Sequence, residues 1–156
     1  MNAKVIFSKT IQGQSQVSDY LDKLIGRKDA KELTVLVFQG FKDLEEAPLS
    51  EYPLGKAEPY LVDRIINGKE VQIELIKKLS EPKIFEMRVD FNGEFHRFIY
   101  FPYIYKDKPL YVFVYGFEKV LGKPDKTNFF MTQAKMLYDL LRRTGRENDF
   151  FQGVKS

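Results

Sequence analysis

Several residue types are scarce in this chain, and each absence narrows the chemistry open to it. The 156 residues include no cysteine, which excludes disulfides, thiol chemistry and cysteine-based zinc sites. Only one histidine is present, His96, so a multi-histidine metal centre is excluded too. There is no apolar run of about 18 residues and no apolar block near the N-terminus, so we expect neither a membrane span nor a secretory signal. The expected setting is reducing and cytoplasmic.

Apolar residues are plentiful, and they suffice for a core. They make up 44% of the chain and include 14 Phe and 9 Tyr. Because compact domains run to ~100–150 residues, we predict a single domain over 1–156. The net charge is +3, and residues 1–80 hold 12 basic and 12 acidic side chains, so the whole excess lies in 81–156. Such a distribution suits a local phosphate-binding surface, and it suits an ordinary solvated surface equally well.

The first half of the chain predicts one strand and two helices. Residues 4–8 are β-branched and apolar, which favours a short strand. Apolar spacing predicts a first helix that is capped by Ser15 or Ser18 and stops at Gly26, and a second helix over 29–46. The segment 47–79 is predicted to be an extended loop or insert: its first part is rich in proline and glycine, and its second part is compatible with a helix or a strand. We expect the tail, 144–156, to be loose.

The second half predicts three strands and a closing helix. Asn92-Gly93 marks a tight turn, because both central residues of such a turn must accept positive φ. A second turn is expected at 106–109 and a third strand at 110–119, followed by a helix from Thr127 to Arg143. The fold class is therefore α+β: an antiparallel sheet of the N-terminal strand and a three-strand meander, with two N-terminal helices and a C-terminal helix laid on one face.

The turn at Asn92-Gly93 fixes a register in which Arg88 faces Arg97. Alternation then places both arginines on the face opposite the one expected to be the core. Two guanidinium groups in direct opposition repel, so something must offset the cost. One interpretation is that Glu86 or Asp90 serves as a local counter-ion. The other is a bound anion, because planar guanidinium forks match phosphate geometry.

Other basic residues are weaker candidates for phosphate contact. Lys119, Lys123 and Lys126 follow the third strand and can ring one end of the sheet, although turns are often lysine-rich for solubility alone. Lys77 and Lys78 allow the same two interpretations. The register points His96 away from the arginines. Most of the strand aromatics are expected in the core, although aromatics can also stack on bases.

The motifs of residues 84–126 resemble the phage-derived HigB-like branch of the RelE/ParE toxin superfamily. The matching residues lie on three successive strands: Glu86, Arg88 and Val89; Arg97, Tyr100 and Phe101; Gly116, Phe117 and Lys119. The preceding strand and two helices are compatible with that family. Three features depart from its pattern, namely Tyr115 in place of a histidine, Val120 in place of a second lysine, and Gly122-Lys123-Pro124 in place of Lys-Thr-Pro.

The resemblance implies a toxin of a type II toxin–antitoxin pair, a ribosome-dependent mRNA endoribonuclease. A ribose 2′-OH would attack the adjacent phosphate without metal or cofactor. Arg88 and Arg97 would bind the phosphate, and Tyr115 or Lys119 would transfer a proton, which requires a lowered pKa if either is to act as a base. Lys77, Lys78, Lys123 and Lys126 would contact RNA. The expected partners are a helix-turn-helix antitoxin and mRNA on the ribosome.

Two rival functions remain open. Relatives of the ParE type share the fold but inhibit DNA gyrase without enzymatic activity. A repurposed phage protein would bind RNA or a partner without cleavage, and Val120 in place of lysine favours this possibility over an intact enzyme. The arginine pair favours the nuclease over a gyrase inhibitor. Fold analogy alone does not decide among them.

Overall fold

The chain has an α+β fold built on one open, mostly antiparallel sheet. The computed structural model describes residues 2–152. Within them the sheet has seven strands: β1 (Lys4–Ser8), β2 (Tyr60–Ile66), β3 (Lys69–Lys78), β4 (Phe85–Phe91), β5 (Glu94–Tyr105), β6 (Lys108–Glu118) and β7 (Phe151–Gln152). The four α-helices are α1 (Gln16–Ile25), α2 (Lys31–Glu46), α3 (Thr127–Thr144) and α4 (Glu147–Phe150), and a 3-10 turn spans Leu49–Glu51.

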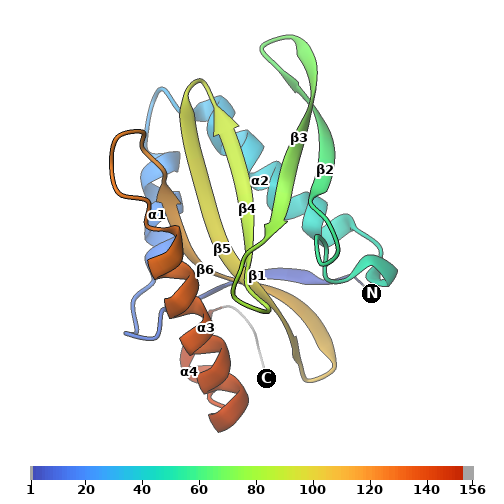
Figure 1. Ribbon diagram of the computed structural model, residues 1–156, viewed down its shortest axis with the longest axis vertical. Coiled ribbons are helices and arrows are strands. Elements are labelled where there is room, and N and C mark those ends of the chain that lie inside the picture. The colour runs from blue at the N-terminus through green and yellow to red at the C-terminus, as the bar shows by residue number, and fades with distance from the viewer. Residues whose placement is uncertain (1, 153–156) are drawn as a thin grey trace.

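The strand order is β2-β3-β4-β5-β6-β1-β7 (Figure 1). Strands β2 to β6 are joined in sequence as antiparallel neighbours, whereas β1 lies parallel to β6. The sheet is therefore larger than the four strands predicted. It gains β2 and β3 at one edge and the short β7 at the other.

Two-residue turns with positive φ close three of the hairpins. They are Asn67-Gly68 (φ 53° and 76°), Asn92-Gly93 (49° and 80°) and Lys106-Asp107 (51° and 62°). Turns of this kind match the right-handed twist of paired strands. The register predicted from Asn92-Gly93 is confirmed, with Phe91 opposite Glu94 and Arg88 opposite Arg97.

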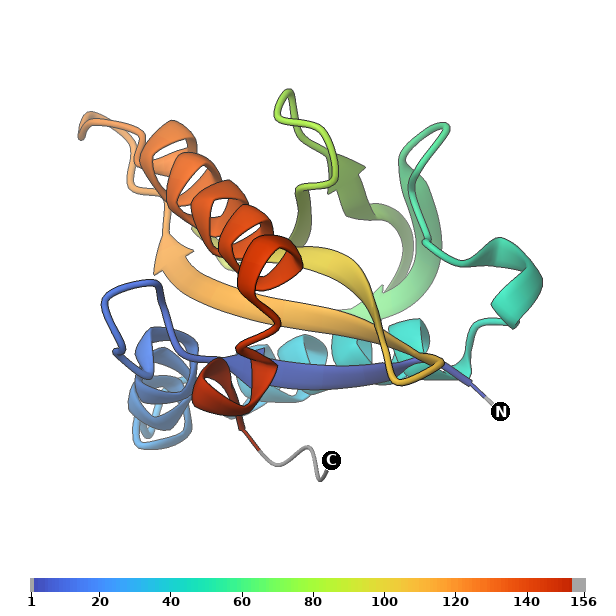
Figure 2. The same ribbon diagram turned by 90° about the horizontal axis from the view of Figure 1, so that it is seen from below.

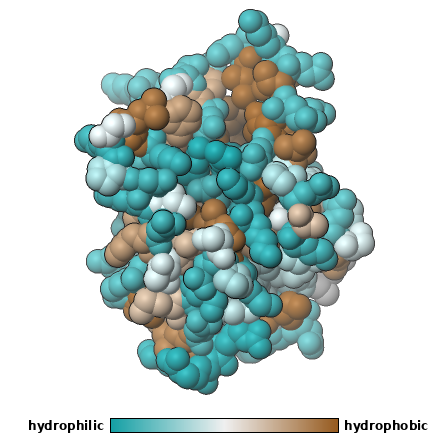
Figure 3. Space-filling view, viewed as in Figure 1, coloured by the Kyte–Doolittle hydropathy of each residue, from teal (hydrophilic) through white to brown (hydrophobic). Residues whose placement is uncertain are grey.

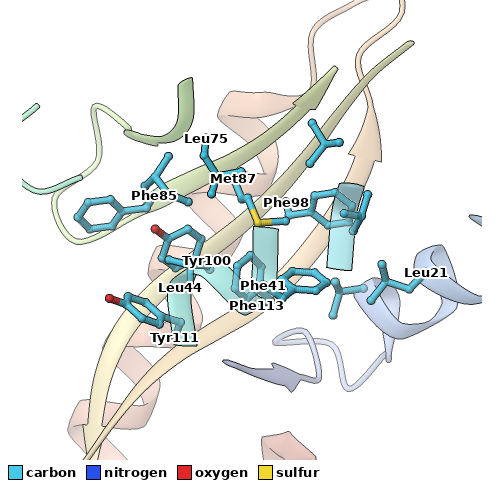
Figure 4. Close-up of a cluster of buried hydrophobic side chains, with 14 of the residues drawn as sticks. Leu21, Phe41, Leu44, Leu75, Phe85, Met87, Phe98, Tyr100, Tyr111 and Phe113 are labelled. Atoms are coloured by element: carbon cyan, nitrogen blue, oxygen red, sulfur yellow. The ribbon is translucent and has the colours of Figure 1, made fainter. Parts of the chain in front are cut away.

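The helices cover both faces of the sheet, so the prediction that they share one face was wrong. Figure 2 shows α3 on one side of the sheet and α1 and α2 on the other. We call these the α3 face and the α2 face. On the α2 face, Met87, Phe98 and Tyr100 pack with Phe41 of α2 in a fully buried cluster (Figure 4). Burial of this apolar surface supplies most of the drive for helix and sheet to associate.

A β-bulge divides the aromatic residues of β6 between the two faces. Ile99 pairs with Tyr115 but Tyr100 pairs with Phe113, so Val114 is the extra residue. Phe113 consequently lies in the α2-face cluster, while Tyr115 lies in the α3-face cluster with Met131 and Tyr138 of α3 among others. Strict alternation would have placed Phe113 and Tyr115 on the same face.

Two predicted irregular segments are ordered in part. The loop predicted over 47–79 extends only to residue 59, because 60–78 forms the β2–β3 hairpin. The tail predicted to be loose holds α4 and β7, and β7 pairs with β1 at Phe7 and Ser8; residues 153–156 lie outside the described residues. Among residues 2–152, no helix is both long enough and apolar enough to cross a membrane.

Candidate functional site

Arg88 and Arg97 occupy the α3 face near the middle of the sheet. They lie directly opposite each other on β4 and β5, and Arg97 is in turn opposite Phe117 on β6. With Glu74 of β3, Glu86 and Asp90 they form what we call the arginine cluster. Figure 3 looks onto this face and shows mostly hydrophilic colour between α3 and the β2–β3 hairpin.

Arg97 is almost fully buried, with 4% of its side chain exposed. Its Nη1 lies 2.5 Å from Asp90 Oδ1 and also donates to the carbonyl of His96 at 3.0 Å. Its Nε lies 3.9 Å from Glu86 Oε1. A buried charge needs such partners, because desolvation without them costs several kcal/mol. Arg97 is therefore held in one orientation by its own neighbours.

Arg88 is more accessible, with 26% of its side chain exposed. Its Nη1 lies 3.3 Å from Glu74 Oε2, and its Nε lies 3.8 Å from Glu86 Oε2. Arg88 Nε and Glu74 Oε1 are both buried without a hydrogen-bond partner among the described residues. Arg88 is thus the more exposed member of the pair, and its one unpaired donor, Nε, is buried.

Glu86 is the carboxylate between the two arginines, and it is only 5% exposed. Burial raises its pKa above the ordinary value. The positive charges of Arg97, Arg88, Lys119 and Lys77 oppose that rise. Four cations from β3, β4, β5 and the end of β6 therefore surround one carboxylate, and a cluster of this kind is a candidate functional site.

No protein-family model, curated protein or solved structure matches this chain. The RelE/HigB resemblance therefore stays a prediction that depends on the motifs of residues 84–126.

The two predicted proton-transfer residues have different surroundings. Tyr115 is 4% exposed and packs against Phe130 of α3 with ring centroids 4.6 Å apart. Burial raises the pKa of Tyr115, the direction opposite to the one that a base requires. Lys119 is 42% exposed, and its Nζ lies 3.2 Å from Asp125 Oδ2. Of these two side chains, Lys119 is the one that reaches solvent beside the cluster.

Asp125 fixes the position of Lys119. Its Oδ1 accepts hydrogen bonds from the hydroxyl and the backbone amide of Thr127, at 2.7 and 2.9 Å. These bonds, with a further contribution from Lys119, lower the pKa of Asp125 to about 2. Asp125 is consequently ionised at neutral pH and serves as a permanent counter-ion for the ammonium group.

The four remaining predicted RNA contacts do not form one patch. Lys77 lies opposite Glu86 and belongs with the arginine cluster. Its neighbour Lys78 lies opposite Phe85 and lines a separate cavity at the lower end of the sheet. Lys123 and Lys126 are exposed in the turn before α3.

His96 lies on the α2 face, away from the arginines, as the register predicted. It is 1% exposed, and its two ring nitrogens lie 2.5 Å from the Tyr20 hydroxyl and 2.9 Å from Glu94 Oε1. Glu94, His96 and Glu118 form a group of the kind that can bind a metal ion, because their possible ligand atoms lie within 4.8 Å of one another. Because both nitrogens already have partners, the arrangement ties α1 to the β4–β5 turn.

Glu74 is the member of the arginine cluster that the sequence did not indicate. It comes from β3, whose residues are compatible with a helix or a strand when read alone. The predicted counter-ions Glu86 and Asp90 are both found in ion pairs with the arginines. Only the pairing of β3 with β4 brings a third carboxylate to the site.

Proposed function

We propose that this chain is a RelE/HigB-type toxin, a metal-independent endoribonuclease that binds mRNA on the ribosome through the α3 face. The observation that supports the proposal is the gathering of Arg88 on β4, Arg97 on β5 and Lys119, directly after β6, around buried Glu86. These are the residues that match the family motifs. Positioned cations in a partly dehydrated site stabilise the charge that develops on a phosphate during transfer.

The two arginines have different roles in this proposal. Arg88 contacts the RNA phosphate, because 26% of its side chain is exposed whereas only 4% of the Arg97 side chain is. Arg97 is a positioning residue, since its buried guanidinium holds Asp90 and Glu86 in place. A bound phosphate would compete with Glu74 for Arg88.

The reaction is attack of a ribose 2′-oxygen on the neighbouring phosphorus. The new bond joins O2′ to phosphorus, the bond from phosphorus to O5′ breaks, and the 2′-hydroxyl proton passes to solvent. Lys119 donates a proton to the departing O5′, so the products are a cyclic phosphate and a 5′-hydroxyl. A small helix-turn-helix antitoxin that covers the α3 face would block access to the cluster.

The second candidate is a non-enzymatic binding protein of the same fold. Two observations favour it. The Arg97 guanidinium is already paired with Asp90 and Glu86, and burial raises the pKa of the Tyr115 hydroxyl. Such a protein would bind RNA or a protein partner without turnover. The gyrase inhibitor belongs to this class.

Induced expression of the wild type beside Arg88→Ala, with primer extension on cellular mRNA, tests the proposal. We expect growth arrest and codon-positioned cuts from the wild type, and neither from Arg88→Ala. Arg88→Lys keeps the positive charge but loses the planar guanidinium with its paired N–H donors, and we expect this variant to be impaired as well. The matched control is Arg143→Ala, since Arg143 is exposed on α3.

Thermal unfolding of each purified variant separates loss of function from loss of fold. A folded wild type that causes neither arrest nor cleavage would rule out the nuclease. If it still binds RNA in a salt-dependent manner, the second candidate is supported. Growth arrest with intact messages and accumulating DNA damage would indicate gyrase as the target.

A further inference from the structure

A cavity of about 700 Å³ lies between the β3–β4 loop and the C-terminal half of α3, at the lower end of the sheet as drawn in Figure 1. Lys78 is the only residue of its lining for which the sequence predicted a function. Its walls come from the loop before β2, the β3–β4 loop, β5 and the C-terminal half of α3. Ligand pockets for small molecules have volumes of roughly 300–1,000 Å³. The cavity is therefore large enough for a nucleotide.

Aromatic rings line much of this cavity, which we call the tyrosine cavity. They belong to Tyr52, Phe85, Tyr103 and Tyr138. The three tyrosine hydroxyls are already engaged: Tyr52 donates to the carbonyl of Leu110 at 2.9 Å, Tyr103 donates to a Glu147 carboxylate, and Tyr138 accepts from Arg142 at 3.1 Å. Because the hydroxyls are held, the rings are fixed in orientation. Phe85 and Tyr138 are buried, so the ring surface open to a ligand belongs to half-buried Tyr52 and Tyr103.

The charge of the lining is positive. Lys78, Lys83 and Arg142 contribute three cations, and Glu147 contributes the one carboxylate of the lining. Glu147 is 9% exposed and is bound to Tyr103, whereas the three cations are exposed. The Arg142 guanidinium lies 5.8 Å from the centroid of the Tyr138 ring, so one positive group is held directly beside an aromatic wall.

The β3–β4 loop separates the tyrosine cavity from the arginine cluster. Ser80 Oγ and the Glu81 amide approach the Met131 sulfur of α3 at 3.5 and 3.4 Å, so the loop reaches across the α3 face to the helix. Lys77 and Lys78, adjacent on β3, consequently lie at different sites.

We propose that the tyrosine cavity binds a nucleotide, with its base against the rings of Tyr52 and Tyr103 and its phosphate at Lys78, Lys83 and Arg142. Aromatic rings accept bases of any sequence by stacking, and exposed cations supply the phosphate contact. The proposal goes beyond the proposed function, because it needs neither cleavage nor the arginine cluster. Free nucleotides and an RNA strand present the same chemistry to the cavity.

Calorimetric titration of the full chain with adenosine monophosphate, adenosine and inorganic phosphate tests this site. We expect the monophosphate to bind roughly tenfold more tightly than either part, because only it satisfies both the rings and the cations. Equal affinities for all three ligands, or no heat with the monophosphate at millimolar concentration, would overturn the proposal.

Basic residues elsewhere on the surface supply matched controls. Arg142→Gln and Lys78→Gln should each weaken adenosine monophosphate binding several-fold, with the fold intact because both side chains are exposed. Arg143→Gln and Lys69→Gln make the same charge change at exposed positions outside the cavity and should leave binding unchanged. If all four variants weaken binding alike, the effect is one of net charge and the site is wrong.

A short RNA added to the nucleotide complex identifies the natural source of the ligand. Displacement of the monophosphate by RNA, with loss of displacement in Lys78→Gln, assigns the cavity to a base of an RNA strand. Binding of RNA without displacement assigns it to a free nucleotide. Both results retain the cavity as a nucleotide site, and neither depends on whether the chain cleaves RNA.

Discussion

Arg88 and Arg97 lie directly opposite each other on β4 and β5, and three carboxylates hold them there. Glu74 pairs with Arg88, Asp90 pairs with Arg97, and Glu86 lies within 4 Å of both. The repulsion between two like charges in direct opposition is thereby offset within the protein. The same carboxylates compete with any phosphate that approaches the pair.

Removal of the Glu74 charge should strengthen RNA binding. Glu74→Gln frees the Arg88 guanidinium from its nearest ion pair, so we expect RNA affinity, measured by fluorescence anisotropy, to rise several-fold. Glu70→Gln is the matched control, because Glu70 lies on the same strand and the net charge changes equally. An equal gain in both variants would mean that the protein's overall charge, rather than Arg88, limits binding.

Lys119 and Tyr115 should differ in their effect on RNA cleavage. Lys119→Met removes the accessible proton donor and should reduce cleavage about 100-fold, the usual contribution of general acid catalysis. Tyr115→Phe should stay within a few-fold of the wild type, because the hydroxyl is buried and its pKa is raised. Lys106→Met makes the same charge change in the exposed β5–β6 turn and serves as the control in a ribosome-programmed cleavage assay. Loss of activity in Tyr115→Phe alone would reverse the assignment.

Gly116 is a position where a side chain cannot be accommodated. A Cβ there would lie 2.9 Å from Tyr20 Cδ2 and 3.2 Å from Phe98. Phe98 is fully buried and Tyr20 is held by His96, so neither ring can move away. We expect Gly116→Ala to cost about 1–3 kcal/mol of unfolding free energy in urea denaturation.

Gly26 provides the comparison for Gly116. Its φ is −75°, and an added Cβ would approach no closer than 3.4 Å to any neighbour. Gly26→Ala should therefore leave stability unchanged or slightly raised. A similar loss in both variants would indicate that crowding at Gly116 is not the cause.

Glu94 should contribute to stability only above acidic pH. Hydrogen bonds from Arg27, then from His96, lower its pKa from 4.5 to about 2. A depressed carboxyl pKa stabilises the fold above the unfolded value near 4.5, and this contribution is lost as the pH falls toward 2. Because the pair is partly exposed, we expect about 1 kcal/mol at pH 6.

Urea denaturation of Glu94→Gln and Arg27→Gln at several pH values checks this linkage. Each variant should be less stable than the wild type at pH 6 and should approach it at pH 2, and the double variant should show less than the sum of the two losses. A pH-independent difference would show that the ion pair is not the source.

Local sequence determined the centre of the sheet. Asn92-Gly93 set the β4–β5 register, because few residues other than Asn and Gly accept positive φ at both turn positions. Apolar periodicity likewise predicted α1, α2 and α3, since each helix buries one stripe against the sheet. The opposition of Arg88 and Arg97 followed by counting from the turn.

Only the tertiary structure decided what surrounds those arginines. The segment 60–78 is compatible with a helix or a strand by itself, and its pairing with β4 made it a strand and brought Glu74 to Arg88. The bulge at Val114 has no sequence pattern of its own, yet it separates Tyr115 from Phe113. Partners distant in sequence, such as Glu74 and Arg88, therefore determined both the exposure of the site's charges and the ion pairs that they form.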